Sequence, residues 1–483
     1  MSAPSRTPNP HLAAYYGIIT SAFVSLIVIL AMFEQLGWSE GAISRGMILL
    51  PLVFYVLVAA GSRTFNIEDY FASGRRVPPV YNALVLAATA VGGVGFFSYT
   101  GTLFFLGFDG LAIGLGWVCG LLLAGVLFVP YLRKAGAFTL PSFLGQRFRS
   151  REVRLGACVM QVPPTALLLA AEIKIAALVA SLFLPLSFSV SVFLVAALVA
   201  TTAILGGMRG LTWTGSAQFI VGAVGLTVTL VVVSILLTNL PAPQFTYGGL
   251  FTSLQNAEIT AGLSPVQAGE ETVALPDSAP KPVVKPFFQP FVAIGETGFI
   301  MLFLCFTFGT AALPSLLVRS GVTPSVHDQR RSSAWALLLV TLFVITAPSM
   351  AAFAKLLMLE DITVNTATVL PPWLSELSGW QLLKASDLNG DGGIGAGELL
   401  IVRDGIALSL PMLSDLPYVL TVLMAAAGMA IALAAAGSHL FTLAASLADD
   451  LYKVIDRRLT ALPRLMAVWA AIAATVLSLV VFL

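Results

Sequence analysis

Long apolar runs constrain this chain more than any other feature of its sequence. A helix needs roughly 20 apolar residues to cross the hydrocarbon core of a bilayer. By that measure the sequence predicts eleven membrane-spanning helices, at residues 13–34, 44–61, 80–107, 111–132, 155–182, 187–206, 213–238, 289–314, 333–358, 416–446 and 460–483. Only 10% of the residues are charged, against about a quarter in soluble domains, which excludes a soluble globular fold. We therefore expect an all-α polytopic membrane protein.

The loops on one side of this arrangement carry most of the positive charge. Eighteen of the 25 Lys and Arg residues fall in residues 1–12, 62–79, 133–154, 207–212, 315–332 and 447–464. Because cytoplasmic loops are enriched in Lys and Arg, this side and the N-terminus are predicted to be cytoplasmic, in the inner (plasma) membrane. The basic loop 133–154 adjoins spans and is read as a topology anchor, so no nucleic-acid partner is expected. Membrane lipid, and a small membrane subunit or a second copy of the chain, are the partners considered.

Glycine interrupts two predicted spans at corresponding places. Gly92, Gly93 and Gly95 lie in the third span, and the eighth span contains a second such stretch, formed by Phe308, Gly309 and Thr310. Interrupted helices at matching positions in two halves indicate the midplane binding site of a transporter, so these six residues are predicted to contact a substrate. The alternative is that the glycines only allow close helix packing.

The interruptions also predict the domain organisation. Two blocks, of five spans starting at 80 and of four spans starting at 289, would form an inverted repeat whose second copy is incomplete, because an odd number of crossings separates their starts. The predicted parts are an N-terminal extra helix with a pre-core helix (1–79), a first repeat (80–238), an outer loop (239–288) and a second repeat (289–483) that carries an outer insertion (359–415).

Six short motifs occur along the chain, at residues 68–75, 105–110, 130–143, 206–214, 308–314 and 449–453. Taken together, they resemble the sodium:solute symporter family, in particular its acetate-permease-like branch. The resemblance implies a LeuT-type inverted five-helix repeat and a symporter that works by alternating access. It also implies a small monocarboxylate, such as acetate, as the solute.

The same resemblance implies one further core helix after the chain ends at Leu483. Three explanations stay open: a partner chain completes the scaffold, the chain is truncated, or it is a divergent member with reduced function.

The resemblance also indicates where a coupling ion would bind. The two positions on which the family places sodium-binding hydroxyls match Ala434 and Ala435, and Thr89 matches a position that is usually polar. Backbone carbonyls near Ala88 and Val91 would supply the other ligands. Methyl groups cannot replace the hydration shell of a hard cation, so Na⁺ by resemblance and H⁺ both stay open as the coupling cation.

Two ionisable residues inside predicted spans are candidates for ion coupling. Glu172 stands where the related branch usually has a glutamine, and His439 follows the two alanines. Such groups cost about 2.5 to 3.5 kcal/mol to insert at a bilayer centre, so they are functional candidates by default. Glu172 could exchange a proton, or it could pair with a neighbouring helix. His439 could relay a proton, or it could be a hydrogen-bonded packing histidine.

The outer insertion contains a sequence that satisfies the EF-hand calcium loop. Asp387, Asn389, Asp391 and Glu398 fall at the positions of side-chain ligands, and Gly393 would offer its carbonyl. A structural Ca²⁺ site is predicted here, with a polar turn that holds no ion as the alternative.

The remaining function classes are less well supported. The three histidines lie in separate places, and no HExxH, GxSxG or phosphate-loop motif is present, so an enzyme is not expected and no cofactor is predicted. A non-transporting receptor or accessory subunit on a transporter scaffold is the alternative to a carrier, because the sodium-site hydroxyls are absent.

Overall fold

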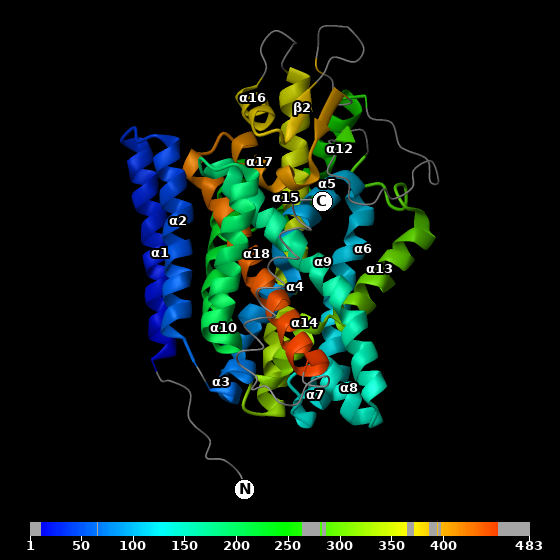
Figure 1. Cartoon of the computed structure of the whole chain (residues 1–483). Coiled ribbons are helices and arrows are strands. Elements are labelled where there is room, and N and C mark those ends of the chain that lie inside the picture. The colour runs from blue at the N-terminus through cyan, green and yellow to red at the C-terminus, as the bar shows by residue number, and fades with distance from the viewer. Residues whose placement is uncertain are drawn as a thin grey trace.

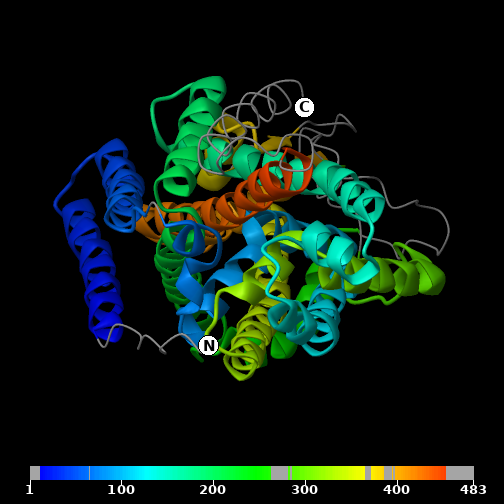
Figure 2. The ribbon, with the colours of Figure 1, turned by 60° about the horizontal axis from the view of Figure 1, so that its bottom comes forward.

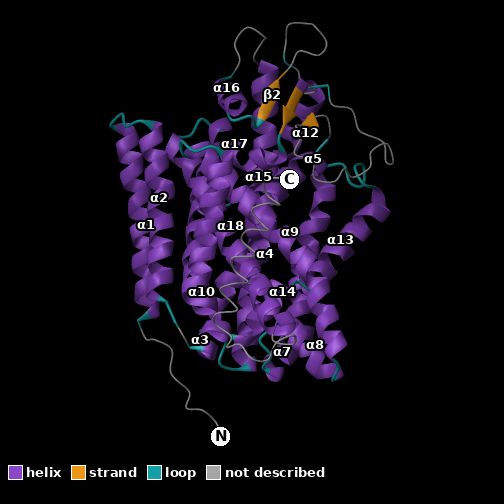
Figure 3. Cartoon of the chain, viewed as in Figure 1, coloured by secondary structure: helices purple, strands orange, loops and turns teal. Residues whose placement is uncertain are grey.

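The structure, a computed structural model, describes residues 11–64, 66–262, 281–282, 286–364, 371–385, 394 and 398–452. These residues are almost entirely helical, with three short strands at one end (Figure 3). Eight segments among them are long and apolar enough to cross a membrane: Leu12–Gln35, Glu40–Gly61, Pro79–Ala135, Arg151–Phe183, Phe188–Thr260, Gly295–Gly321, Val326–Ile362 and Tyr418–Leu451. The all-α polytopic prediction is therefore confirmed.

Eight segments correspond to ten of the eleven predicted spans. The segments of 57 and 73 residues are too long for one crossing, and each contains two of the predicted spans. Gly107 (φ 55°) divides the first, and Gly207 (φ 52°) divides the second. The last predicted span, 460–483, lies outside the described residues.

The first half of the chain forms a pair of helices followed by the first group of core helices. Its elements are α1 (Leu12–Gln35), α2 (Glu40–Gly61), α3 (Ile67–Ala72), η1 (Ser73–Arg75), α4 (Pro79–Gly93), η2 (Val94–Tyr99), α5 (Thr100–Leu106), η3 (Gly107–Gly110), α6 (Leu111–Leu123), η4 (Ala124–Phe128), α7 (Val129–Ala135), α8 (Leu140–Phe148), α9 (Arg151–Phe183) and α10 (Phe188–Thr238). The α1 and α2 helices stand at one side of the bundle (Figure 1).

The second half alternates long helices with short outer elements. Its elements are α11 (Pro243–Thr246), η5 (Tyr247–Leu250), α12 (Phe251–Thr260), β1 (Lys281–Pro282), α13 (Gly295–Ala311), α14 (Pro314–Leu317), η6 (Val318–Gly321), α15 (Val326–Val364), α16 (Pro372–Gly379), β2 (Leu383–Ala385), β3 (Leu399–Ile401), η8 (Arg403–Gly405), α17 (Ile406–Leu413), α18 (Tyr418–Ser446) and η9 (Leu447–Tyr452). The strands form a small antiparallel sheet in the order β1-β3-β2.

The α18 helix is the centre of the bundle, and it crosses the middle of the molecule in Figure 2. It packs against α10, α9 and α4, and every residue from Val419 to Ser446 is buried. Its many Ala and Gly residues explain this position, because small side chains let neighbouring helices approach closely. Gly428, for example, lies directly against Phe96 and Phe97.

The connections gather at two opposite ends of the bundle, as Figure 1 shows for α3, α7 and α8 at one end and α12, α16 and β2 at the other. The described parts of the loops that the charge bias assigned to the cytoplasm lie at the α3 end. At the other end, the buried Asp109 carboxylate accepts hydrogen bonds from the backbone N–H groups of Phe291 (2.6 Å), Ala293 (2.9 Å) and Ile294 (3.2 Å). Asp109 thus fixes the chain immediately before α13.

Candidate transport site

The α4 helix is broken in the middle of the bundle at Gly92. This residue has φ 62° and ψ 175°, a conformation that is essentially restricted to glycine. The π-helical segment η2 follows directly. A break of this kind leaves the first N–H groups of the second half-helix without helical acceptors, and it places the positive end of a helix dipole inside the protein.

The carboxylate of Glu172, on α9, occupies this half-helix end. Its Oε2 atom accepts a hydrogen bond from the Gly93 N–H at 2.7 Å, and the Val94 N–H also reaches the carboxylate. Glu172 is 3% exposed, and among the described residues it has no ion pair with Lys or Arg. The sequence left open whether Glu172 pairs with a hydroxyl or a charge, and the structure shows backbone amides instead.

The three glycines around the break lie against different neighbouring residues. A side chain at Gly92 would collide with Glu172 Oε1, and one at Gly93 would collide with Ala432 of α18. Gly95 lies against the ring of Trp117 on α6. The break therefore faces α9 and α18.

That second interruption exists, but its residues lie differently from the prediction. The α13 helix ends at Ala311, Leu313 is extended, and α14 begins at Pro314. Phe308 is 60% exposed and Gly309 is exposed with open space around it, and contact of either residue with a substrate stays a prediction. Thr310 is buried, but it packs against Gly120 of α6.

The predicted ion positions on α4 and α18 do come together. Ala88, Val91, Ala434 and Ala435 are all buried, and the hydroxyls of Thr89 and Ser438 lie 2.9 Å apart. Ser438 also donates to the carbonyl of Ala434 at 3.1 Å. Sequence reasoning missed Ser438, which lies one helical turn after Ala434 and restores a hydroxyl near the two alanines.

His439 follows Ser438 directly in α18 and is also buried. It is 2% exposed, and its Nδ1 atom has no hydrogen-bond partner in the described part of the chain. The predicted alternatives, a proton relay and a hydrogen-bonded packing histidine, therefore both stay predictions.

A cavity of about 250 Å³ lies next to the α4 break. Val91 and Phe96, on either side of Gly92, form part of its wall, and residues of α10, α11, α15 and α18 with the loop before α11 form the rest. Its lining is apolar except for Thr227, Gln244 and Thr346, and no charged side chain contributes to it. The cavity is large enough for a small organic solute, which would bury an apolar body there.

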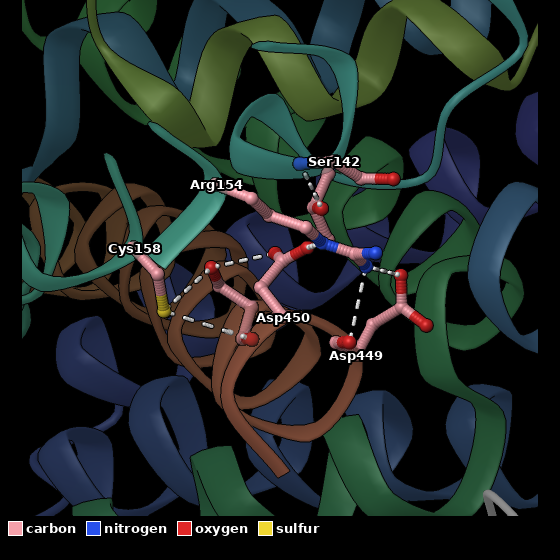
Figure 4. Close-up of polar contacts among 7 residues, drawn as sticks. Ser142, Arg154, Cys158, Asp449 and Asp450 are labelled. Carbon is pink, nitrogen blue, oxygen red and sulfur yellow. Dashed lines mark hydrogen bonds and ion pairs between the residues drawn. The ribbon is translucent and has the colours of Figure 1, made fainter. Parts of the chain in front are cut away.

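A polar cluster joins α9 to the end of α18 on the side predicted to be cytoplasmic (Figure 4). Arg154 binds Asp450 (Nε to Oδ1, 2.7 Å) and Asp449 (Nη2 to Oδ2, 3.0 Å). Ser446 donates to Asp450 Oδ2 at 3.0 Å and lies beside the buried Cys158. The cluster closes this end of the seam between the two helices.

The predicted calcium loop lies mostly outside the described residues. These exclude Asp387, Asn389, Asp391 and Gly393, whereas Glu398 is described and buried. In the described part of the chain, no group of three or more His, Cys, Asp or Glu side chains could hold a metal ion. Calcium binding therefore stays a prediction from the sequence alone.

A bundle of membrane-spanning helices with one helix broken at its centre is the architecture of a secondary transporter rather than an enzyme. The model of the sodium:solute symporter family matches residues 70–369. The chain belongs to this family.

The chain is also similar to individual proteins. An uncharacterized symporter of Cupriavidus necator is 27% identical over 92% of this chain and 78% of its own length. A monocarboxylic acid transporter of Corynebacterium glutamicum is 26% identical to this chain. The matched region covers 65% of this chain and 55% of that relative. A substrate-bound, outward-open structure of a Na⁺-coupled sialic acid symporter superimposes with a TM-score of 0.66 at 17% identity, over 91% of this chain and 79% of that one. This likeness supports the LeuT-type fold.

Proposed function

We propose that this protein is a secondary active symporter that carries a small monocarboxylate, such as acetate, by alternating access. The α4 break at Gly92 is the observation that carries the proposal, because it interrupts a core helix beside a cavity that Val91 and Phe96 help to line. The name of the Corynebacterium glutamicum relative supports a monocarboxylate as the solute. The cavity beside Val91 would receive the apolar part of such a solute.

Within this proposal, Glu172 is the coupling group and H⁺ is the coupling ion. The hydrogen bonds that the carboxylate accepts from Gly93 and Val94 offset part of the cost of burying its negative charge. When the half-helix moves away, the buried carboxylate loses these donors and takes up a proton more readily. Proton binding and the movement of α4 would thus be linked through one side chain.

Sodium is the second candidate for the coupling ion. Family membership favours it, and the hydroxyls of Thr89 and Ser438 with the carbonyls of Ala88 and Val91 could contribute oxygen ligands. The methyl groups of Ala434 and Ala435 argue against it, because they leave the α18 side without hydroxyls at the positions the family uses.

Uptake into proteoliposomes separates these possibilities. Vesicles that contain only this chain are given labelled acetate or pyruvate under a proton gradient and, separately, under a sodium gradient. We expect the proton gradient to drive uptake in the native protein but not in Glu172→Gln. Glu296→Gln is the matched control, because Glu296 is an exposed acid in the first turn of α13.

The outcomes divide clearly. Unchanged proton-driven uptake by Glu172→Gln would refute the role of Glu172. Uptake that follows only the sodium gradient would assign the coupling to sodium. No uptake under either gradient, with solute binding retained, would favour a receptor over a carrier.

The orientation in the membrane is part of the same proposal. We assign the end with α3, α7 and α8 to the cytoplasm because the basic loops gather there (Figure 1). A protease site placed before α1 should be cut only from the cytoplasmic side of inner-membrane vesicles.

A further inference from the structure

Arg319 is a fully buried cation that the proposed transport mechanism has not used. It lies in η6, directly after the interruption between α13 and α14, and it is 1% exposed. Its Nη1 atom donates to Thr212 Oγ1 at 3.3 Å. Its Nε and Nη2 atoms have no hydrogen-bond partner among the described residues.

Several acidic side chains at this end of the bundle bind other cations. The pairs are Glu68 with Arg75, Asp69 with Arg76 and Arg209, and Asp449 and Asp450 with Arg154. Glu152 and Asp328 instead accept hydrogen bonds from the hydroxyls of Ser150 and Ser325. Within the described part of the chain, no carboxylate forms an ion pair with Arg319. A buried charge without a counter-charge is strongly unfavourable, so the buried guanidinium group of Arg319 lowers the stability of the fold.

The two unpartnered donors share one edge of the guanidinium group. The Nε and Nη2 groups point in the same direction and together bind both oxygens of a carboxylate. Ser315 lies four residues earlier in the continuous segment formed by α14 and η6, and therefore on the same face. Its hydroxyl is also completely buried and without a partner among the described residues.

This group of donors lies close to the proposed ion site. Leu211, the neighbour of Thr212 in α10, packs against Gly437 of α18, and the next residue, Ser438, meets Thr89. The α14 helix also contacts α4, α9 and α18. Arg319 is thus placed among the core helices, on the α3 side of the α4 break.

We propose that Arg319 and Ser315 form a binding site for the carboxylate group of the solute in the half of the pathway that leads to the cytoplasm. This inference rests on the proposed function and names the side chains that recognise the charge. The positive half-helix end at Gly93 already holds Glu172, and the cavity beside Val91 has no charged lining. Arg319 supplies a positive charge for the carboxylate of an anionic solute.

The test measures carboxylate binding and stability together. The purified full chain in detergent is melted with and without acetate or pyruvate, and with acetamide as the neutral analogue of acetate. We expect both carboxylates, but not acetamide, to raise the melting temperature of the native protein. Arg319→Gln should abolish this shift, and in proteoliposomes it should raise the KM for uptake at least tenfold. Arg319→Lys should be intermediate because an ammonium group cannot offer two parallel donors.

A structural role for Arg319 predicts a different pattern. Without solute, Arg319→Gln should melt at or above the temperature of the native protein, because it removes an uncompensated charge, whereas loss of a structural arginine would lower it. Arg209→Gln is the control, since Arg209 is a half-exposed cation of the same end that already pairs with Asp69, and its KM should not change.

The results also separate this inference from the proposed function. Native uptake together with an unchanged KM in Arg319→Gln would overturn the carboxylate site and leave the carrier intact. If the native protein takes up no monocarboxylate, the carrier proposal fails, and the carboxylate site at Arg319 is then tested by the melting data alone. A carboxylate-dependent shift that Arg319→Gln loses would then still support the site, and absence of the shift in the native protein would refute it.

Discussion

Replacement of Gly92 by alanine tests the geometry of the α4 break in isolation. An alanine at φ 62° and ψ 175° carries backbone strain of about 1 to 3 kcal/mol. Its Cβ would also displace the Glu172 carboxylate, and hydrogen bonds to a charged group are worth about 1.5 to 3 kcal/mol. We therefore expect a destabilisation of about 3 to 6 kcal/mol, and a melting temperature lowered by several degrees, if the contributions add.

A double-mutant cycle separates the two contributions. In a Glu172→Ala background the collision partner is gone, so Gly92→Ala should cost only the backbone strain of about 1 to 3 kcal/mol. The melting temperatures of the four purified proteins in the same detergent provide the measurement. Equal losses from Gly92→Ala in both backgrounds would show that Glu172 does not lie against the break.

Three further predictions concern other parts of the molecule. Arg154→Gln removes the ion pairs at the end of α18 (Figure 4) and should let a maleimide label the buried Cys158; protection of Cys158 in the variant would contradict the proposed closure. Lys355→Met leaves the buried Glu258 without the ammonium group that lies 2.7 Å away, and it should lower the free energy of unfolding by about 3 to 5 kcal/mol. The double variant Lys355→Met with Glu258→Leu should recover most of this loss. A single variant that melts like the native protein would refute this prediction. Calcium at about 10⁻⁴ to 10⁻³ M should raise the melting temperature of the native protein but not of Asp391→Asn, and the absence of any shift would remove the calcium prediction.

Hydropathy and glycine content predicted the helices and the α4 break well, because both are local properties of the chain. A run of glycines in a membrane helix indicates either a break in the helix or a close contact with a neighbour. The run around Gly92 provides both. The family resemblance agreed with the match to the family model. The inverted-repeat boundaries, the solute and the ion stay proposals.

The sequence failed where tertiary packing decides which way a residue faces. Phe308 and Gly309 lie near the end of α13, and the sequence did not show that both residues are exposed. From the sequence, Arg319 was counted as one more basic residue of a cytoplasmic loop, because a single sequence does not show how deeply a residue is buried in the bundle. Ser438 was missed because every face of α18 is buried, so no polar stripe distinguishes the face that meets Thr89.

The central claim is that movement of the broken α4 helix is coupled to a proton on Glu172, and solute-induced proton flux tests it most directly. Proteoliposomes with an internal pH indicator receive external pyruvate, an anion that crosses bare bilayers slowly, in the absence of sodium. The account predicts that the interior acidifies with native protein and with Glu296→Gln, and not with Glu172→Gln or with empty vesicles. Pyruvate entry that requires sodium and leaves the internal pH unchanged would contradict it.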